Sequence, residues 1–191
     1  IKSKTQNVQL ILECTSTLLS NITPIDNQLG AFNFYISQMK RIFFHYPKAN
    51  KFFSISYPFS IEIDDDDNFH VWAMNKSIEI TPYFISLLRS LSEQGWFDEK
   101  NMNNDLYGNI TELEEVLEEY GATYDELGFI ILDLVNLLRS VEVGYIRCDI
   151  EDHANFKKNS PHIHPINHLD VNYSQHSTYK IGLKRKMDEN I

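Results

Sequence analysis

The feature that most constrains this fold is a change of hydrophobic period on either side of Gly144. Upstream, Thr123–Ser140 combines a Thr-x-x-Glu capping box with apolar residues at helical spacing. Downstream, apolar and polar residues alternate through 145–150, 166–173 and 178–183. A period of two places the apolar side chains on one face of a strand. These three segments therefore predict an antiparallel meander with one apolar face.

A second alternating region lies earlier in the chain. Residues 52–64 alternate Phe, Ile and Tyr with Ser and Glu, with an interruption near Pro58, and 69–74 alternate again after the aspartate run at 64–67. Aromatic and β-branched residues favour strands, so the region predicts a β-hairpin. The aspartates should form a solvated turn, because they lack the ligand spacing and the glycine of an EF-hand loop.

The remaining apolar segments have helical spacing. Thr81 is an N-cap followed by a first-turn proline, and Thr111 and Thr123 each begin a capping box. The segment after Thr123 is so apolar that it should form the central helix. Helices are predicted over Thr5–Leu19, Gln28–Phe44, Thr81–Leu91, Thr111–Tyr120 and Thr123–Ser140.

Together these elements predict one α+β domain over residues 1–183, followed by a polar tail over residues 184–191. A chain of 191 residues suits a single domain, and 42% hydrophobic residues supply an ordinary core. We expect one antiparallel sheet, built from the Phe52–Met74 hairpin and the C-terminal three-strand meander, that packs against Thr123–Ser140 and the other helices.

The charge balance limits the class of partner. A formal charge of −10 and a pI near 5.1 argue against a protein that coats nucleic acid, so nucleic acid would have to bind at a local basic site. Five glutamates within Thr111–Tyr120 favour a protein partner with a basic surface instead. No apolar run approaches the roughly 18 residues of a membrane span. Two distant cysteines, Cys14 and Cys148, are typical of reduced thiols in a cytoplasmic protein.

The second face of the predicted meander carries residue types that are common at reactive sites. They are Arg147, Asp149, His168, Asp170, Asn172 and Lys180. Alternation alone explains polar residues on the solvent side of a sheet, and this is the simpler interpretation. A solvated strand usually carries Lys, Glu, Thr and Ser, however, whereas His, Asp and Arg move protons or hold phosphate. In a catalytic interpretation His168 is the general base, and Arg147 or Lys180 stabilises the anionic transition state of phosphodiester cleavage.

Histidine spacing supplies a second version of this site. His162-x-His164 precedes His168-x-Asp170, so three imidazoles and a carboxylate could bind one divalent metal ion. A metal-bound water would then be the nucleophile. Repeats of the x-His-x type also arise in loops that bind no metal, so the cofactor stays open.

The run H-P-x-x-H-L-D at residues 164–170 resembles the C-terminal signature of small uncharacterised bacterial proteins. An R-x-D strand precedes the run and a short strand with a lysine follows it, over about forty residues in all. Some of these proteins are encoded near phage-defence or toxin–antitoxin genes. The resemblance implies a bacterial, cytoplasmic protein and assigns no catalytic role to these residues.

Two function hypotheses follow. The first is a partner-binding accessory component of a defence or toxin–antitoxin type system, which holds a basic protein through its acidic helices. The second is a hydrolase, nuclease-like or phosphodiesterase-like, with its site on the C-terminal sheet. The site would use His164, His168, Asp170, Arg147 and Asp149. The negative charge favours the first hypothesis.

Overall fold

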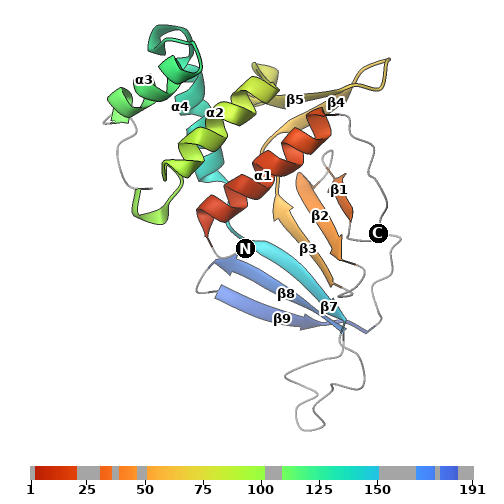
Figure 1. Cartoon of the computed structure of the whole chain (residues 1–191). Coiled ribbons are helices and arrows are strands. Elements are labelled where there is room, and N and C mark those ends of the chain that lie inside the picture. Colours follow the sequence, from red (N-terminus) through yellow and green to blue (C-terminus); the bar gives the residue numbers. More distant parts are fainter. Residues whose placement is uncertain are drawn as a thin grey trace. The chain divides into compact units, whose positions relative to one another are not determined.

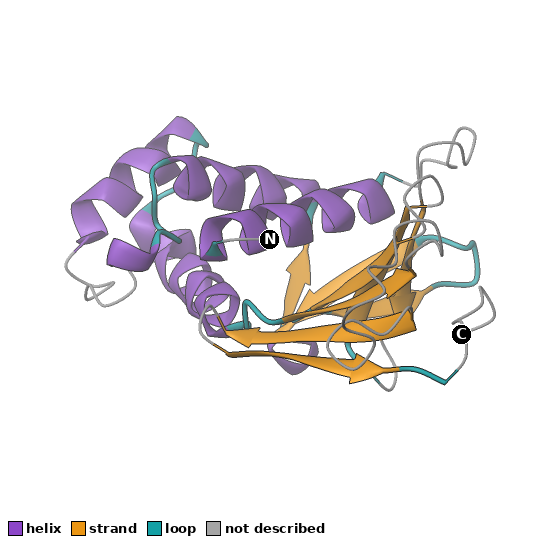
Figure 2. Ribbon diagram, turned by 90° about the horizontal axis from the view of Figure 1, so that it is seen from below, coloured by secondary structure: helices purple, strands orange, loops and turns teal. Residues whose placement is uncertain are grey.

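The protein has an α+β fold of helices and antiparallel sheets (Figures 1 and 2), which confirms the predicted fold class. The computed structural model describes residues 3–20, 31–35, 39–46, 51–101, 109–150, 167–174 and 177–184. Two compact units alternate along the chain: unit 1 comprises Ile1–Thr23 and Tyr57–Val141, and unit 2 comprises Pro24–Ser56 and Glu142–Ile191. The single folding domain over 1–183 stays a prediction.

Unit 1 contains the long helices of the described chain. They are α1 (Lys4–Leu19), α2 (Pro82–Glu93), α3 (Ile110–Glu119) and α4 (Phe129–Ser140), with the π turn η5 (Tyr124–Gly128) directly before α4 and the short 3-10 turns η2 (Met74–Lys76) and η3 (Glu99–Asn101). Helix α1 lies along α2 (Figure 1). Each helix buries one apolar stripe, as Ile11, Leu88 and Leu134 illustrate with no exposed surface. None of the helices in the described ranges is long and apolar enough to cross a membrane.

The predicted helix ends are largely confirmed. Thr81 is the N-cap of α2 and its side chain accepts from the Phe84 backbone N–H, with Pro82 in the first turn. The carboxylate of Glu126 accepts from the backbone N–H of Thr123 at 3.0 Å, as a capping box requires. Helix α3 instead begins at Ile110 with Asn109 as its N-cap, so the capping box predicted at Thr111 is wrong.

A three-stranded sheet completes unit 1. It consists of β4 (Ser60–Ile63), β5 (Phe69–Ala73) and β6 (Ile78–Ile80), which are antiparallel neighbours in that order. Val71, Ala73 and Ile80 are buried on one face, and α1 contacts β5. The β4–β5 pair confirms the second half of the predicted hairpin, with the aspartates in an exposed turn.

Unit 2 is built on a six-stranded antiparallel sheet. Its order is β1 (Ala31–Tyr35), β2 (Arg41–Tyr46), β3 (Lys51–Ser56), β7 (Tyr145–Ile150), β8 (Asn167–Ser174) and β9 (Ser177–Gly182). The β7–β8–β9 meander confirms the strands predicted after Gly144. The pairing of β3 with β7 joins two parts of the chain that are far apart in sequence.

The helix predicted over Gln28–Phe44 is wrong, because this segment contains strands β1 and β2. Its density of apolar residues suits either structure, and in the sheet Phe34 lies opposite Ile42. The turn between the two strands contains Lys40 at φ 46°, a left-handed conformation that a helix does not tolerate. Aromatic and β-branched residues pack well on a pleated surface, so tertiary pairing overrides the helical spacing.

The predicted single sheet is also wrong in detail, because the alternating segment 52–64 is divided between two sheets. Strand β3 ends at Ser56 and belongs to unit 2, whereas β4 begins at Ser60 and belongs to unit 1. Pro58 lies between them. A proline has no backbone N–H for a ladder hydrogen bond. The interruption of the alternating pattern at Pro58 is therefore the boundary between two sheets.

Candidate functional site

Three of the predicted site residues form one row across the meander. In the register of the sheet, Arg147 on β7 lies opposite Asp170 on β8, which lies opposite Lys180 on β9. A guanidinium nitrogen of Arg147 is 2.7 Å from Asp170 Oδ2, and Lys180 Nζ is 3.0 Å from Asp170 Oδ1. The carboxylate is therefore held between two cations.

His168 completes this group, which we call the polar cluster: Arg147, His168, Asp170 and Lys180. The Nε2 atom of His168 is 3.0 Å from Lys180 Nζ and 3.6 Å from Asp170 Oδ1, and the residue is 1% exposed. An ammonium group can only donate a hydrogen bond, so Nε2 of His168 must accept it. A hydrogen bond from Lys180 to this atom is therefore compatible only with a ring whose Nε2 carries no proton.

The electrostatics of the cluster keep Asp170 ionised. Burial by itself raises the pKa of Asp170. The hydrogen bond and charge of Lys180, together with Arg147, lower this pKa by more than burial raises it, so the net pKa is below the ordinary value. The side chain of Asp170 is 12% exposed, whereas the side chains of Arg147 and Lys180 are 37% and 36% exposed. Asp170 is thus a weak base, and the exposed parts of the cluster are cationic.

The cluster shares its face of the sheet with apolar residues. Phe53 on β3 lies opposite Arg147, and the neighbouring Ile55 and Ile42 on the same face are fully buried. On the other face of the meander, where the sequence predicts the covered side, Tyr179 and Ile181 are 55% and 45% exposed. The expected arrangement of covered apolar and open polar faces is therefore wrong for His168, Asp170 and β9.

The structure thus brings together four of the predicted catalytic residues. Asp149 lies opposite His168 in the backbone register, but its side chain is outside the described residues, as are His162 and His164. The metal site predicted from these histidines stays a prediction. Within the described ranges, no group of three His, Cys, Asp or Glu residues could hold a metal ion.

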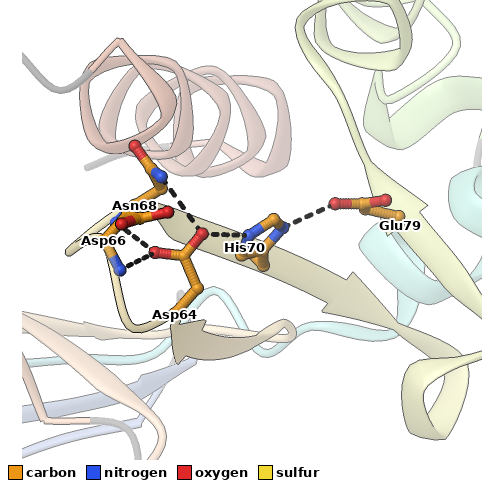
Figure 3. A network of polar contacts seen from close by, with 5 residues as sticks. All are labelled: Asp64, Asp66, Asn68, His70 and Glu79. Atoms are coloured by element: carbon orange, nitrogen blue, oxygen red, sulfur yellow. Dashed lines mark hydrogen bonds and ion pairs between the residues drawn. The ribbon is translucent and has the colours of Figure 1, made fainter.

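A second polar network, which the sequence analysis did not predict, lies on the exposed face of the three-stranded sheet (Figure 3). The ring of His70 bridges two carboxylates: Nδ1 is 2.9 Å from Glu79 Oε1, and Nε2 is 3.2 Å from Asp64 Oδ2. Asp64 also accepts from the backbone N–H of Asp66 and Asn68, which closes the turn. Alternation along β5 places His70 opposite Glu62 on the polar face, which was the available signal.

The two carboxylates favour the charged form of this imidazole. Hydrogen bonds to Glu79 and then Asp64 raise the pKa of His70, since both ring nitrogens must donate to acceptor-only groups. Hydrogen bonds from Asn68 lower the pKa of Asp64 to about 2, with a smaller contribution from His70. While His70 is protonated, its two hydrogen bonds therefore link the β4–β5 turn to β6.

An exposed acidic surface covers α3. Its five glutamates, at 112, 114, 115, 118 and 119, are all exposed, whereas Leu113, Val116 and Leu117 are buried. Unit 1 holds 19 of the 27 acidic residues and six of the 17 basic ones, which gives it a formal charge of −13 against +3 for unit 2. The negative charge of the protein is thus concentrated in one unit.

No protein-family model, curated protein or solved structure matches this chain.

We predict that Asp170→Asn lowers the free energy of unfolding by about 1.5–3 kcal/mol at pH 7, because Arg147 and Lys180 lose their negative partner. The folded-state pKa of Asp170 is depressed, so its stabilisation is complete above the unfolded pKa of about 3.9 and is lost as pH falls through the folded-state pKa. Urea unfolding at several pH values should show the difference shrinking in acid. The exposed Asp133→Asn control should change little, and a difference independent of pH would contradict the ion pairs.

We also predict that His70 titrates above the ordinary histidine pKa of about 6.5. Glu79→Gln should move the titration midpoint down, because it removes the charge at Nδ1, whereas Glu93→Gln on α2 should not. The stabilisation from His70 is complete below the unfolded pKa and is lost as pH rises through the raised, folded-state pKa. Proton NMR of the His70 imidazole measures the titration midpoint. An equal midpoint in the wild type, Glu79→Gln and Glu93→Gln would rule out the hydrogen bonds from His70 to Glu79 and Asp64.

Proposed function

We propose that this protein is a binding component that holds a basic protein partner through the acidic surface of unit 1, rather than an enzyme. The observation that carries the proposal is the set of glutamates on α3. They are exposed, and no lysine or arginine occurs in the helix. Within the described part of the chain, none of the five forms an ion pair.

The positions of these glutamates work against the stability of their own helix. Glu118 and Glu119 lie in the last turn, where the backbone carbonyls give the helix end a partial negative charge. Glu114 and Glu118, and likewise Glu115 and Glu119, are separated by four residues and repel each other. Such effects amount to about 0.2–1 kcal/mol each. A charge pattern that weakens the fold without an internal partner is typical of a binding surface.

The separation of charge between the units supports the same proposal. A formal charge of −13 in unit 1 attracts a cationic partner over a Debye length of about 8 Å at physiological salt. Complementary charge speeds association and selects the partner, and contacts at the interface then add affinity. Protein and not nucleic acid is the partner that this unit favours.

The resemblance at residues 164–170 suggests the biological setting. We propose a bacterial, cytoplasmic accessory component of a phage-defence or toxin–antitoxin type system. Cys14 and Cys148 are free and buried, and burial raises the pKa of Cys14 to about 12, which keeps the thiol unreactive. Buried, reduced thiols suit a reducing compartment.

A triple variant of α3 tests the binding proposal. Glu115→Gln, Glu118→Gln and Glu119→Gln should raise the free energy of unfolding by roughly 1 kcal/mol, because repulsion is removed. The immobilised wild-type chain should retain basic proteins from a lysate of the source organism, and mass spectrometry identifies them. The immobilised triple variant should not retain these proteins.

The matched control changes the aspartates at 65, 66 and 67 to asparagine, which removes the same charge from the exposed β4–β5 turn. This control should keep the partner. Equal loss in both variants, or retention of the partner by the α3 variant, would contradict a binding surface on α3. If the wild-type chain retains no basic protein, the proposed function is wrong.

The contacts within the polar cluster favour a second candidate, a phosphodiester hydrolase. His168 lies beside Lys180 and Asp170, and the half-exposed cations of Arg147 and Lys180 suit an anionic substrate. The tight pairing of Asp170 and the burial of His168 favour a structural role instead.

Hydrolysis of bis(p-nitrophenyl) phosphate, with and without added Mg²⁺, Mn²⁺ or Zn²⁺, separates these alternatives. We expect the wild type and a His168→Ala, Asp170→Ala double variant to give the same background rate, since the cluster acts structurally. Lys180→Ala, on an exposed strand, controls for unfolding of the double variant, and circular dichroism checks the fold of each. Wild-type turnover that both variants abolish would favour the hydrolase.

A further inference from the structure

We infer that the corner between α3 and α4 is a docking surface for a lysine- and arginine-rich segment that carries large apolar side chains. The corner, which we call the α3–α4 corner, consists of residues 118–129 together with Tyr83 of α2. The inference rests on the proposed function and adds to it the place of contact and the chemistry of the partner segment.

Aromatic side chains are exposed at both ends of this corner. Phe129, at the start of α4, is 63% exposed, and its ring centroid lies 5.6 Å from that of Tyr124. Tyr83 is 37% exposed and makes an edge contact with Tyr120, with the two ring centroids 6.1 Å apart. Exposed aromatic residues that already contact another ring of the protein are suited to anchor a protein–protein interface.

Hydrogen bonds hold the second aromatic pair in place. The Tyr83 hydroxyl donates to the Tyr120 carbonyl at 3.3 Å, and the Tyr120 hydroxyl donates to the Ser86 carbonyl at 3.1 Å. These bonds tie the end of α3 to the first turns of α2. Ordered aromatic side chains lose little conformational entropy when a partner binds, so they contribute efficiently to affinity.

The π turn shapes the other end of the corner. A Cβ atom at Gly128 would lie 2.4 Å from Cδ2 of Tyr124, so only glycine allows the Tyr124 ring to lie over the turn. That ring supports one side of Phe129 and leaves most of the Phe129 side chain exposed. π turns are rare and are frequent at functional sites. The local structure therefore holds the Tyr124 ring beside an exposed Phe129.

Acidic residues lie close in sequence to the aromatic residues at 120, 124 and 129. Glu118, Glu119, Asp125 and Glu126 are exposed, and residues 118–129 contain no lysine or arginine. Apolar anchors bordered by charge of one sign fit a partner segment with the complementary pattern, in which lysine or arginine flanks a large apolar side chain. Charge alone attracts any basic protein, and the exposed rings select those that also offer an apolar anchor.

Two synthetic peptides test the inference on the full chain by fluorescence anisotropy at about 150 mM salt. One contains lysine and leucine, and the other has glutamine in place of every leucine, so that their charges are equal. The wild type should bind the leucine peptide at least tenfold more tightly. A Tyr83→Ser, Phe129→Ser variant should bind both peptides alike, because it removes the anchors and keeps the acidic residues.

Ile63→Ser is the matched control, because Ile63 is 61% exposed and precedes four aspartates outside the corner. It should keep the tenfold preference. Equal binding of both peptides by the wild type, or an unchanged preference in the Tyr83, Phe129 variant, overturns the docking surface and leaves the proposed function intact. Binding of neither peptide removes the proposed function as well. A wild-type dimer that Phe129→Ser dissociates would identify a second copy of the chain as the occupant and overturn the inference.

Discussion

The antiparallel pairing of β3 with β7 is the constraint on which unit 2 depends. It joins a strand that ends at Ser56 to one that begins at Tyr145, and the residues of unit 1 from Tyr57 to Val141 lie between them in the chain. Closing so long a connection carries an entropic cost, which the ladder hydrogen bonds and the burial of Ile42 and Ile55 must offset. The pairing also sets the register between the β1–β2–β3 half and the β7–β8–β9 half of the sheet, and it places Arg147 opposite Phe53.

The polar cluster shows how a sheet accommodates charge next to an apolar surface. Removing a carboxylate from water costs several kcal/mol unless it is paired, and Asp170 is paired on both sides. His168 is buried beside this carboxylate and lies within hydrogen-bond distance of Lys180, so its polar ring also has a partner. Pairs of this kind specify register, because a slip of one residue would move Asp170 to the opposite face. The same contacts explain why residue types typical of an active site can serve a structural purpose.

In unit 1, unlike the polar cluster of unit 2, much of the charge weakens the fold. The glutamates of α3 repel one another and oppose the helix dipole, whereas Glu126 caps the next helix and His70 bridges two carboxylates. Negative charge is therefore stabilising where the local geometry supplies a donor and destabilising where it does not. Among the described residues the glutamates of α3 form no ion pair, and in our proposal this is the part of the charge that a partner uses.

The sequence by itself determined the α+β class, the four long helices of unit 1 and the meander after Gly144, because hydrophobic period and capping residues act locally. It also placed Arg147, Asp170 and Lys180 on one face, since alternation along a strand needs no tertiary information. It did not determine that Gln28–Phe44 forms strands, because a dense apolar segment suits a helix or a sheet until it has a partner.

Only the tertiary structure decided which face of the meander is covered and which residues meet. Alternation indicates two faces and does not say which one is buried, so the burial of His168 and the exposure of Tyr179 were not predictable. The bridge from Asp64 through His70 to Glu79 depends on the register of three strands, and the exposure of Phe129 depends on a π turn that Gly128 permits. Period and capping are properties of neighbouring residues, whereas burial and register arise from segments that are distant in the chain.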